Sequence, residues 1–101
     1  MKTIFVYILL CSDESYNTGV TAHLGDRFRA HQNGKDQKSY TFSRRPLKLV
    51  YVELFTSPYK AIVREKQIKG WSRAKKEALI SGDINQLKLL AQRKRKLKPL
   101  N

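Results

Sequence analysis

Four side chains have types that phosphodiester hydrolysis can use, in a set that is consistent with this chemistry but not specific to it: Tyr7, Arg27, His31 and Glu65. An arginine stabilises the negative charge that builds on phosphate oxygens in the transition state. A glutamate supplies a hard oxygen ligand for a divalent metal ion, and a tyrosine or histidine can relay the proton of the attacking water. Arg27 and His31 are four positions apart, so a helix would direct both toward the same point. The set is therefore consistent with a phosphodiesterase site.

Each of these side chains also has an ordinary structural explanation. Tyr7 can be a core aromatic residue with its hydroxyl at the surface, and His31 can be a half-buried histidine with satisfied hydrogen bonds. Arg27 and Glu65 can each pair with an opposite charge nearby. Other catalytic patterns are missing from the sequence, which has no glycine-rich phosphate loop and too few acidic residues for a two-metal carboxylate cage. His23 is eight positions from His31, so the two do not share a helical face as a metal-binding pair would.

The charge of the chain points to a polyanionic partner. Its 101 residues include 21 Lys and Arg against 8 Asp and Glu, which gives a net charge of +13. Such an excess repels itself in the folded state, and nucleic acid offsets it because each neutralised phosphate releases counterions. An anionic membrane surface is the weaker alternative. The length and the 41% hydrophobic share fit one small globular domain.

A single cysteine, Cys11, excludes an internal disulfide and a cysteine-cluster zinc site, and we expect no disulfide-linked partner. Because Cys11 ends an apolar run, we expect a small buried residue rather than a reactive thiol. The run begins at Ile4, is too short to span a bilayer and lacks a signal-peptide cleavage site. We therefore expect a cytoplasmic protein that does not enter membranes.

Hydrophobic patterning predicts a small sheet covered by helices. The expected strands are 4–11, 16–20 and 47–55, and the expected helices are 22–32, 58–69, 73–81 and a last one that starts at 84. The expected N-terminal caps of these helices are Thr21, Ser57, Ser72 and Asp83. The first strand should be central in the sheet because it is continuously apolar, and the third should be mostly buried on both faces. In the second helix, Glu65 shares a stripe with apolar residues, while residues 35–46 should form a basic loop.

Four segments resemble, in order and spacing, the motifs of the GIY-YIG nuclease superfamily. Residues 5–9, FVYIL, and residues 16–21, YNTGVT, resemble the paired GIY and YIG motifs. Residues 23–31, HLGDRFRAH, are similar to the arginine-bearing helix that follows them, and residues 61–73, AIVREKQIKGWSR, to the segment with the family's glutamate. The resemblance is greatest to small stand-alone bacterial GIY-YIG proteins, which are related to the N-terminal nuclease domain of the UvrC excinuclease subunit.

The resemblance implies an α+β fold with a small three-stranded antiparallel sheet flanked by helices. It implies a nuclease-like domain over residues 1–82, to which residues 83–101 add a C-terminal helix and a basic tail within the same single domain. Members of the family cleave DNA by hydrolysis with one divalent metal ion, Mg²⁺ or Mn²⁺. By position, Glu65 would ligate the metal, Arg27 would hold the scissile phosphate and Tyr7 would act at the nucleophile. His31 matches a histidine of this subgroup and would assist proton transfer.

Asn17 stands where the second motif usually has a tyrosine. An asparagine can orient water but cannot act as a phenolic acid or base, and strand alternation turns Tyr16 to the other face. Two functions therefore remain open: a metal-dependent DNA endonuclease of repair or recombination, and a nucleic-acid-binding module of the same fold that cleaves weakly or not at all. DNA is the expected partner, with RNA as the alternative, and no oligomeric state is predicted. The expected phosphate contacts are Lys38, Arg44, Arg45, Lys66, Lys69 and Arg73.

Overall fold

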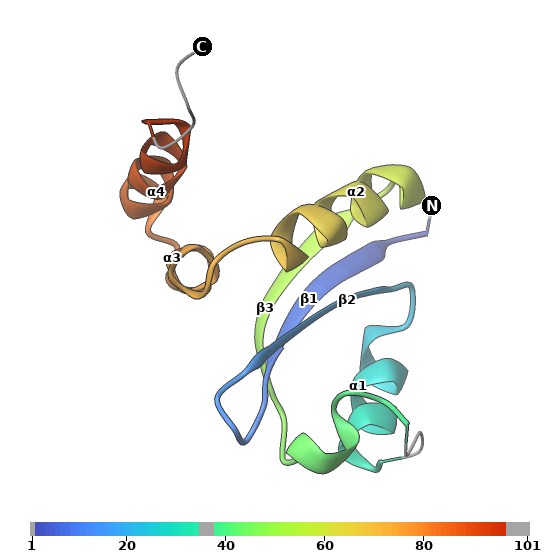
Figure 1. Cartoon of the computed structure of the whole chain (residues 1–101). Coiled ribbons are helices and arrows are strands. Elements are labelled where there is room, and N and C mark those ends of the chain that lie inside the picture. Colours follow the sequence, from blue (N-terminus) through green and yellow to red (C-terminus); the bar gives the residue numbers. More distant parts are fainter. Residues whose placement is uncertain (1, 35–37, 97–101) are drawn as a thin grey trace. The chain divides into compact units, whose positions relative to one another are not determined.

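The computed structural model describes residues 2–34 and 38–96, the last five of them by their backbone alone. Contacts between elements divide the chain into two compact units, Met1–Lys69 and Gly70–Asn101. The first unit holds the sheet and two helices, and the second holds two further helices (Figure 1). The layout expected from the sequence, with residues 1–82 and 83–101 in one domain, stays a prediction.

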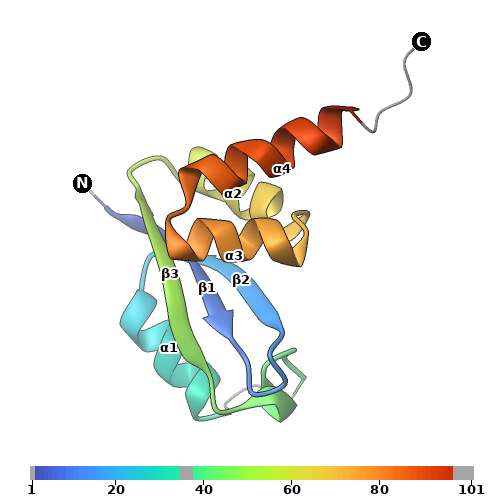
Figure 2. The ribbon, with the colours of Figure 1, turned by 90° about the vertical axis from the view of Figure 1, so that its left-hand side faces the viewer.

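A three-stranded antiparallel sheet forms the centre of the first unit, as predicted. Strand β1, Ile4–Leu10, pairs on one side with β2, Tyr16–Thr21, and on the other with β3, Lys48–Phe55 (Figure 2). The four central residues of β1, from Val6 to Leu9, are at most 2% exposed, which agrees with the continuous apolar run. The prediction that β3 is buried on both faces was wrong. It is an edge strand, and Leu54 is 65% exposed.

The two faces of the sheet are covered by different helices. Tyr7 and Leu9 belong to a core cluster on which α1, Leu24–Gln32, packs through Leu24 and Phe28. Val6 and Ile8 alternate with these residues and therefore point to the other face. Helix α2, Pro58–Lys69, contacts all three strands and covers that face with a buried stripe that contains Glu65.

The end of α1 and the start of α2 follow the predicted chemistry, whereas the start of α1 and the end of α2 do not: Gly70, expected to end α2 in the left-handed conformation, does not have a positive φ. Thr21 does not cap α1, because its Oγ1 accepts the backbone N–H of His23 at 3.0 Å and the helix begins only at Leu24. The helix ends before Gly34, whose φ of 63° is in the left-handed region that glycine favours. At the start of α2, Ser57 Oγ accepts the backbone N–H of Lys60 at 3.3 Å, which confirms the predicted cap.

The segment between α1 and β3 is held at two points. It contains a short 3₁₀ helix, η1, Phe42–Arg44. The carbonyl of Arg44 accepts the N–H of Ser12 at 2.9 Å, which attaches the segment to the β1–β2 turn. Three residues later, Leu47 joins the segment to the last residue of α1: the Gln32 amide donates to the carbonyl of Leu47 at 2.9 Å and accepts its N–H at 2.8 Å. The part of this segment that starts at residue 38 is therefore attached both to the β1–β2 turn and to α1.

The second unit contains α3, Arg73–Ser81, and α4, Ile84–Lys96, which pack against each other. Ser72 caps α3 by accepting the N–H of Lys75 at 3.2 Å, and Gly82 ends it with a φ of 74°. Asp83 caps α4 through the N–H of Gln86 at 3.0 Å. All three boundaries confirm the predictions. In the part of the chain that the structure describes, every helix is too short or too polar to cross a bilayer.

Candidate active site

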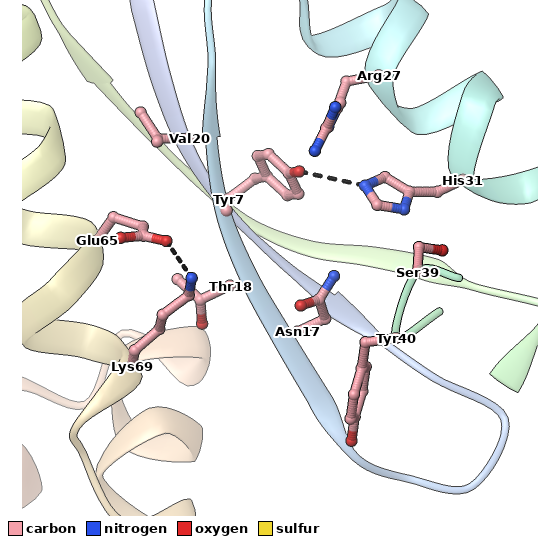
Figure 3. Close-up of a pocket in the computed structure, with 11 residues that line it drawn as sticks. Tyr7, Asn17, Thr18, Val20, Arg27, His31, Ser39, Tyr40, Glu65 and Lys69 are labelled. Carbon is pink, nitrogen blue, oxygen red and sulfur yellow. Dashed lines mark hydrogen bonds and ion pairs between the residues drawn. The ribbon is translucent and has the colours of Figure 1, made fainter. Parts of the chain in front are cut away.

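A pocket of about 310 Å³ lies along β2 in the first unit (Figure 3). Its lining comes from β1, β2, α1, α2 and the segment before η1: Tyr7, Asn17, Thr18, Gly19, Val20, Arg27, His31, Ser39, Tyr40, Glu65 and Lys69. The pocket therefore contains every residue that the sequence predicted for catalysis and for metal binding.

On the α1 side of β2, a tyrosine meets a histidine. The Tyr7 hydroxyl and His31 Nε2 are 3.4 Å apart, and the two rings meet edge to face with centroids 6.5 Å apart. Burial lowers the pKa of His31 below its usual 6.5, and the positive charge of Arg27 lowers it further. The imidazole is thus neutral at pH 7, and a neutral imidazole can accept a proton. Figure 3 shows the Arg27 guanidinium extending toward the Tyr7 hydroxyl.

A buried threonine fixes the other nitrogen of His31. Thr41 is completely buried, and its Oγ1 lies 2.7 Å from His31 Nδ1. The Ser39 hydroxyl is 3.2 Å from the same Oγ1. The Thr41 hydroxyl can accept a hydrogen bond from Nδ1–H or donate one to Nδ1, so its direction is coupled to what Nε2 offers to Tyr7.

Gly19 makes room for the Tyr7 ring. The two residues are direct cross-strand partners, so their Cα atoms lie on the same face of the sheet. A methyl group at Gly19 would lie 2.5 Å from Cζ of Tyr7, far inside van der Waals contact, and would meet the hydroxyl as well. Tyr7 is only 2% exposed, so its ring could not move aside without disturbing the core. Gly19 therefore permits the orientation in which Tyr7 reaches His31.

On the α2 side of β2, the pocket is lined by the Glu65 carboxylate, the Lys69 ammonium group and the Thr18 hydroxyl. Glu65 is 8% exposed, and its Oε2 lies 2.5 Å from Lys69 Nζ, one helical turn away. Thr18 is 5% exposed, and within residues 2–34 and 38–96 its Oγ1 has no hydrogen-bond partner. A buried hydroxyl without a partner is costly. In Figure 3 it lies beside the Glu65–Lys69 pair, across β2 from Tyr7.

The α2 side fits a hydrated divalent ion held by few protein ligands. Among the described residues no three His, Cys, Asp or Glu side chains gather to form a complete cage. Mg²⁺, however, commonly binds through one carboxylate, several waters and substrate phosphate. Glu65, which pairs with Lys69, could provide the carboxylate, and the Thr18 hydroxyl could provide a further oxygen.

Asn17 takes the position that the sequence comparison gave to a motif tyrosine. It pairs with Leu9 in a regular β1–β2 register and lines the pocket between Tyr7 and Tyr40 (Figure 3). Tyr16 pairs with Leu10 and is outside the pocket lining, as alternation predicts.

The predicted phosphate-binding residues fall into three groups. Lys69 lines the pocket, while Lys66 and Lys38 are exposed elsewhere on the first unit. Arg44 and Arg45 bond within the protein, Arg44 to Asp13 at 3.0 Å and Arg45 to the carbonyl of Phe42 at 2.9 Å. The last, Arg73, belongs to α3 in the second unit and pairs with Glu77 at 3.2 Å. Their contact with phosphate stays a prediction.

Sequence reasoning missed four site residues: Thr18, Gly19, Ser39 and Thr41. Gly19 had a signal, since it is the glycine of the second motif and faces Tyr7 across the sheet. Thr18 could have been placed by alternation opposite Ile8. Ser39 and Thr41 had no signal, because they lie in a stretch without periodicity. Thr41 contacts His31, and Ser39 contacts Thr41, only through tertiary structure.

Comparison with known proteins gives a consistent family. The model of the GIY-YIG catalytic domain matches residues 3–78. A UPF0213 protein of Syntrophus aciditrophicus is 46% identical over 80 residues, which cover 79% of this chain and 92% of that one. Another, of Clostridium perfringens, is 49% identical over 77 residues, 76% of this chain and 82% of the relative. The solution structure of a UPF0213 protein of Bacillus halodurans is 40% identical, with a TM-score of 0.52 over 78% of this chain and 83% of that chain. The chain therefore belongs to the GIY-YIG domain family, a nuclease-type family, together with the UPF0213 proteins.

Proposed function

We propose that this chain is a metal-dependent endonuclease that hydrolyses phosphodiester bonds of DNA, in repair or recombination. The observation that carries the proposal is the pairing of the Tyr7 hydroxyl with His31 Nε2 at 3.4 Å in a pocket that also contains Arg27 and Glu65. A proton acceptor, a cation and a buried carboxylate are the parts that phosphodiester hydrolysis requires.

In the proposed reaction, His31 Nε2 accepts the proton of the Tyr7 hydroxyl while Tyr7 takes a proton from the attacking water. The water oxygen forms a bond to phosphorus, one P–O ester bond breaks, and the leaving oxygen takes a proton from a solvent water and ends as an alcohol, while His31 releases its proton to the solvent. Arg27 stabilises the charge on the phosphate oxygens. The hydrogen bond between Tyr7 and His31 is long at 3.4 Å, and such bonds commonly shorten when substrate binds.

Thr41 is compatible with the tautomer that this role requires. If His31 Nδ1 carries the proton and donates it to Thr41 Oγ1, Nε2 is free to accept from Tyr7. The Thr41 hydroxyl can then donate to Ser39 at 3.2 Å. Because either hydroxyl can be the donor, the reverse tautomer makes an equally consistent set of hydrogen bonds, and it is the proposed role that assigns the proton to Nδ1.

Glu65 would hold the divalent metal, Mg²⁺ or Mn²⁺, with Thr18 beside it. When bound, such an ion supplies Lewis-acid stabilisation of the phosphate. Lys69 pairs with the Glu65 carboxylate and would be close enough to turn toward a phosphate once a metal shares that carboxylate. Asn17 would orient water through its amide.

A cleavage assay tests the proposal. Labelled linear duplex, nicked, flapped and single-stranded DNA is incubated under single-turnover conditions with Mg²⁺, Mn²⁺ or EDTA. We expect cleavage only with metal, lowered by roughly 10²-fold or more in Tyr7→Phe because a positioned proton acceptor contributes that much. Tyr59→Phe is the matched control, since Tyr59 is 76% exposed on α2 and outside the pocket.

The same assay, together with a binding measurement on the same DNAs, distinguishes the endonuclease from the alternative function. Binding that weakens steeply with salt, without cleavage of any of the four substrates in either metal, would refute the enzyme and favour the nucleic-acid-binding module. The substitution of Asn17 for the motif tyrosine is the observation behind that alternative.

A further inference from the structure

An aromatic ring at the pocket has no role in the proposed chemistry. Tyr40 lines the pocket next to Asn17 and Ser39, and it is 48% exposed. Figure 3 shows its ring extending along the pocket below Asn17, away from His31. Phe42, the other aromatic residue of this segment, is half-buried and outside the pocket lining. Tyr40 is thus the aromatic surface that a substrate in the pocket would meet.

The Tyr40 ring is held in place from one side. The Arg44 guanidinium lies 3.9 Å from the ring centroid, within the range of a cation–π contact. Arg44 in turn is fixed, because its Nε contacts Asp13 Oδ2 at 3.0 Å and its Nη1 donates to the Tyr40 carbonyl at 2.7 Å. The guanidinium therefore covers one face of the ring and has its charge balanced by Asp13, while Tyr40 as a whole stays 48% exposed.

A rigid, half-exposed aromatic face beside a phosphodiesterase pocket suits a nucleobase. Every base has a π face, and stacking on an aromatic side chain contributes substantially to single-strand binding. A base inside a duplex has both faces covered by its neighbours, so only an unpaired, terminal or splayed base can stack on a protein ring.

We propose that Tyr40 is a stacking platform for an unpaired base next to the scissile phosphate, an inference that rests on the function proposed above. The substrate class is then DNA with a single-stranded or splayed nucleotide at the cut, and not continuous duplex. Arg44 acts as a positioning residue that supports the ring. This role explains why Arg44 pairs with Asp13 and the Tyr40 carbonyl within the protein.

Binding of two DNAs by four full-length proteins tests this inference. Fluorescence anisotropy in EDTA, where no cleavage occurs, compares a flapped DNA with a fully paired duplex of the same length and charge. The proteins are the unchanged chain, Tyr40→Phe, Tyr40→Leu and the control Tyr59→Leu. Tyr59 is an exposed tyrosine outside the pocket, so its substitution removes an aromatic ring without touching the site.

We expect Tyr40→Leu to bind the flapped DNA roughly 10-fold more weakly, with its duplex affinity unchanged. Tyr40→Phe and Tyr59→Leu should bind both DNAs as the unchanged chain does. An equal loss on both DNAs would overturn the inference, and so would a loss in Tyr40→Phe as large as in Tyr40→Leu, because that would indicate a hydroxyl contact to phosphate.

Cleavage in Mg²⁺ or Mn²⁺ is measured separately, so the two proposals can fail independently. Selective loss of flap binding in Tyr40→Leu by a chain that never cleaves would support the stacking platform and refute the endonuclease. Cleavage that does not distinguish the flapped DNA from the duplex in any variant would refute the platform alone.

Discussion

The two sides of β2 differ in how far the protein itself organises them. On the α1 side, hydrogen bonds join Tyr7, His31 and Thr41 into one connected set, and the last of these is completely buried. On the α2 side, the Glu65 carboxylate pairs with its neighbour Lys69, and the Thr18 hydroxyl has no hydrogen-bond partner among the described residues. The first side is arranged by packing, whereas the second has oxygen atoms suited to a cation that arrives with the substrate.

This difference assigns separate tasks to the two sides. Substitutions on the α1 side should change the rate of proton transfer and its pH dependence while metal affinity stays the same. Substitutions on the α2 side should change the dependence on metal concentration. Each prediction below tests whether the tasks are divided in this way.

The largest effect is expected from Glu65→Gln, which keeps the volume of the side chain and removes its charge. Loss of the ionised ligand should lower metal-dependent cleavage by roughly 10³-fold, and added Mn²⁺ should not restore it. Single-turnover rates across a metal titration measure this. Glu53→Gln is the matched control, since Glu53 also pairs with a cationic side chain, Arg64 at 2.8 Å, but lies outside the pocket. An equal loss in both variants would remove Glu65 from the site.

The second-largest loss of activity is expected from Gly19→Ala. The added methyl group would overlap the Tyr7 ring, so the ring must turn away from His31 or the strands must separate. We expect a loss of activity of roughly 10²-fold, similar to Tyr7→Phe, together with lower stability. Cleavage rate and thermal unfolding are measured together. Gly25→Ala is the control, because a methyl group there would lie 3.7 Å from its nearest neighbour in an ordinary contact. Full activity in Gly19→Ala would contradict the described position of Tyr7.

A smaller effect is expected from Thr41→Val, which replaces a buried hydroxyl by a methyl group of similar size. His31 Nδ1 would lose its partner, at a cost of about 1–3 kcal/mol in stability. Loss of tautomer control should lower the rate roughly 10-fold and change the acid limb of the pH–rate profile. Thr41→Ser keeps the hydroxyl and should restore both readouts. If Thr41→Val changes only the melting temperature, the residue has a purely structural role.

The smallest effect is a dependence of stability on pH that comes from His31. Burial lowers its pKa in the folded protein, so the unfolded chain binds more protons below pH 6.5. The corresponding stability is complete above pH 6.5 and is lost as the pH falls from there through the folded pKa. Denaturant unfolding at neutral and mildly acidic pH should show this loss in the unchanged chain and a smaller one in His31→Gln. The reverse order would mean that the folded protein favours the protonated imidazole.

Much of the fold could be predicted because its signals are local. The apolar run from Ile4 indicated a central strand, and the Ser57, Ser72 and Asp83 caps indicated helix starts within one residue. The burial of β3 could not be predicted, because strand order decides whether an apolar strand lies at the centre or the edge of a sheet. The β-branched composition of a strand does not contain that information.

The site residues that lie in the sequence motifs could be predicted, and those outside the motifs could not. Arg27 and His31 share a helical face, and Tyr7 and Glu65 were matched by resemblance. That Glu65 reaches the pocket from the opposite face of the sheet could not be read from the sequence, since it depends on how α2 crosses the strands. Thr41 was equally hidden, because its only relevant contact joins residues ten positions apart across a turn.

The central claim is that both sides of β2 act on one phosphate. A crystal structure of Tyr7→Phe with flapped DNA and Mn²⁺ tests it directly, because this variant should retain uncut substrate and anomalous scattering locates the ion. We predict that the ion is bound by Glu65 and that a single phosphate group contacts both the ion and the Arg27 guanidinium. An ion bound away from Glu65, or a phosphate that reaches only one side of β2, would contradict the account.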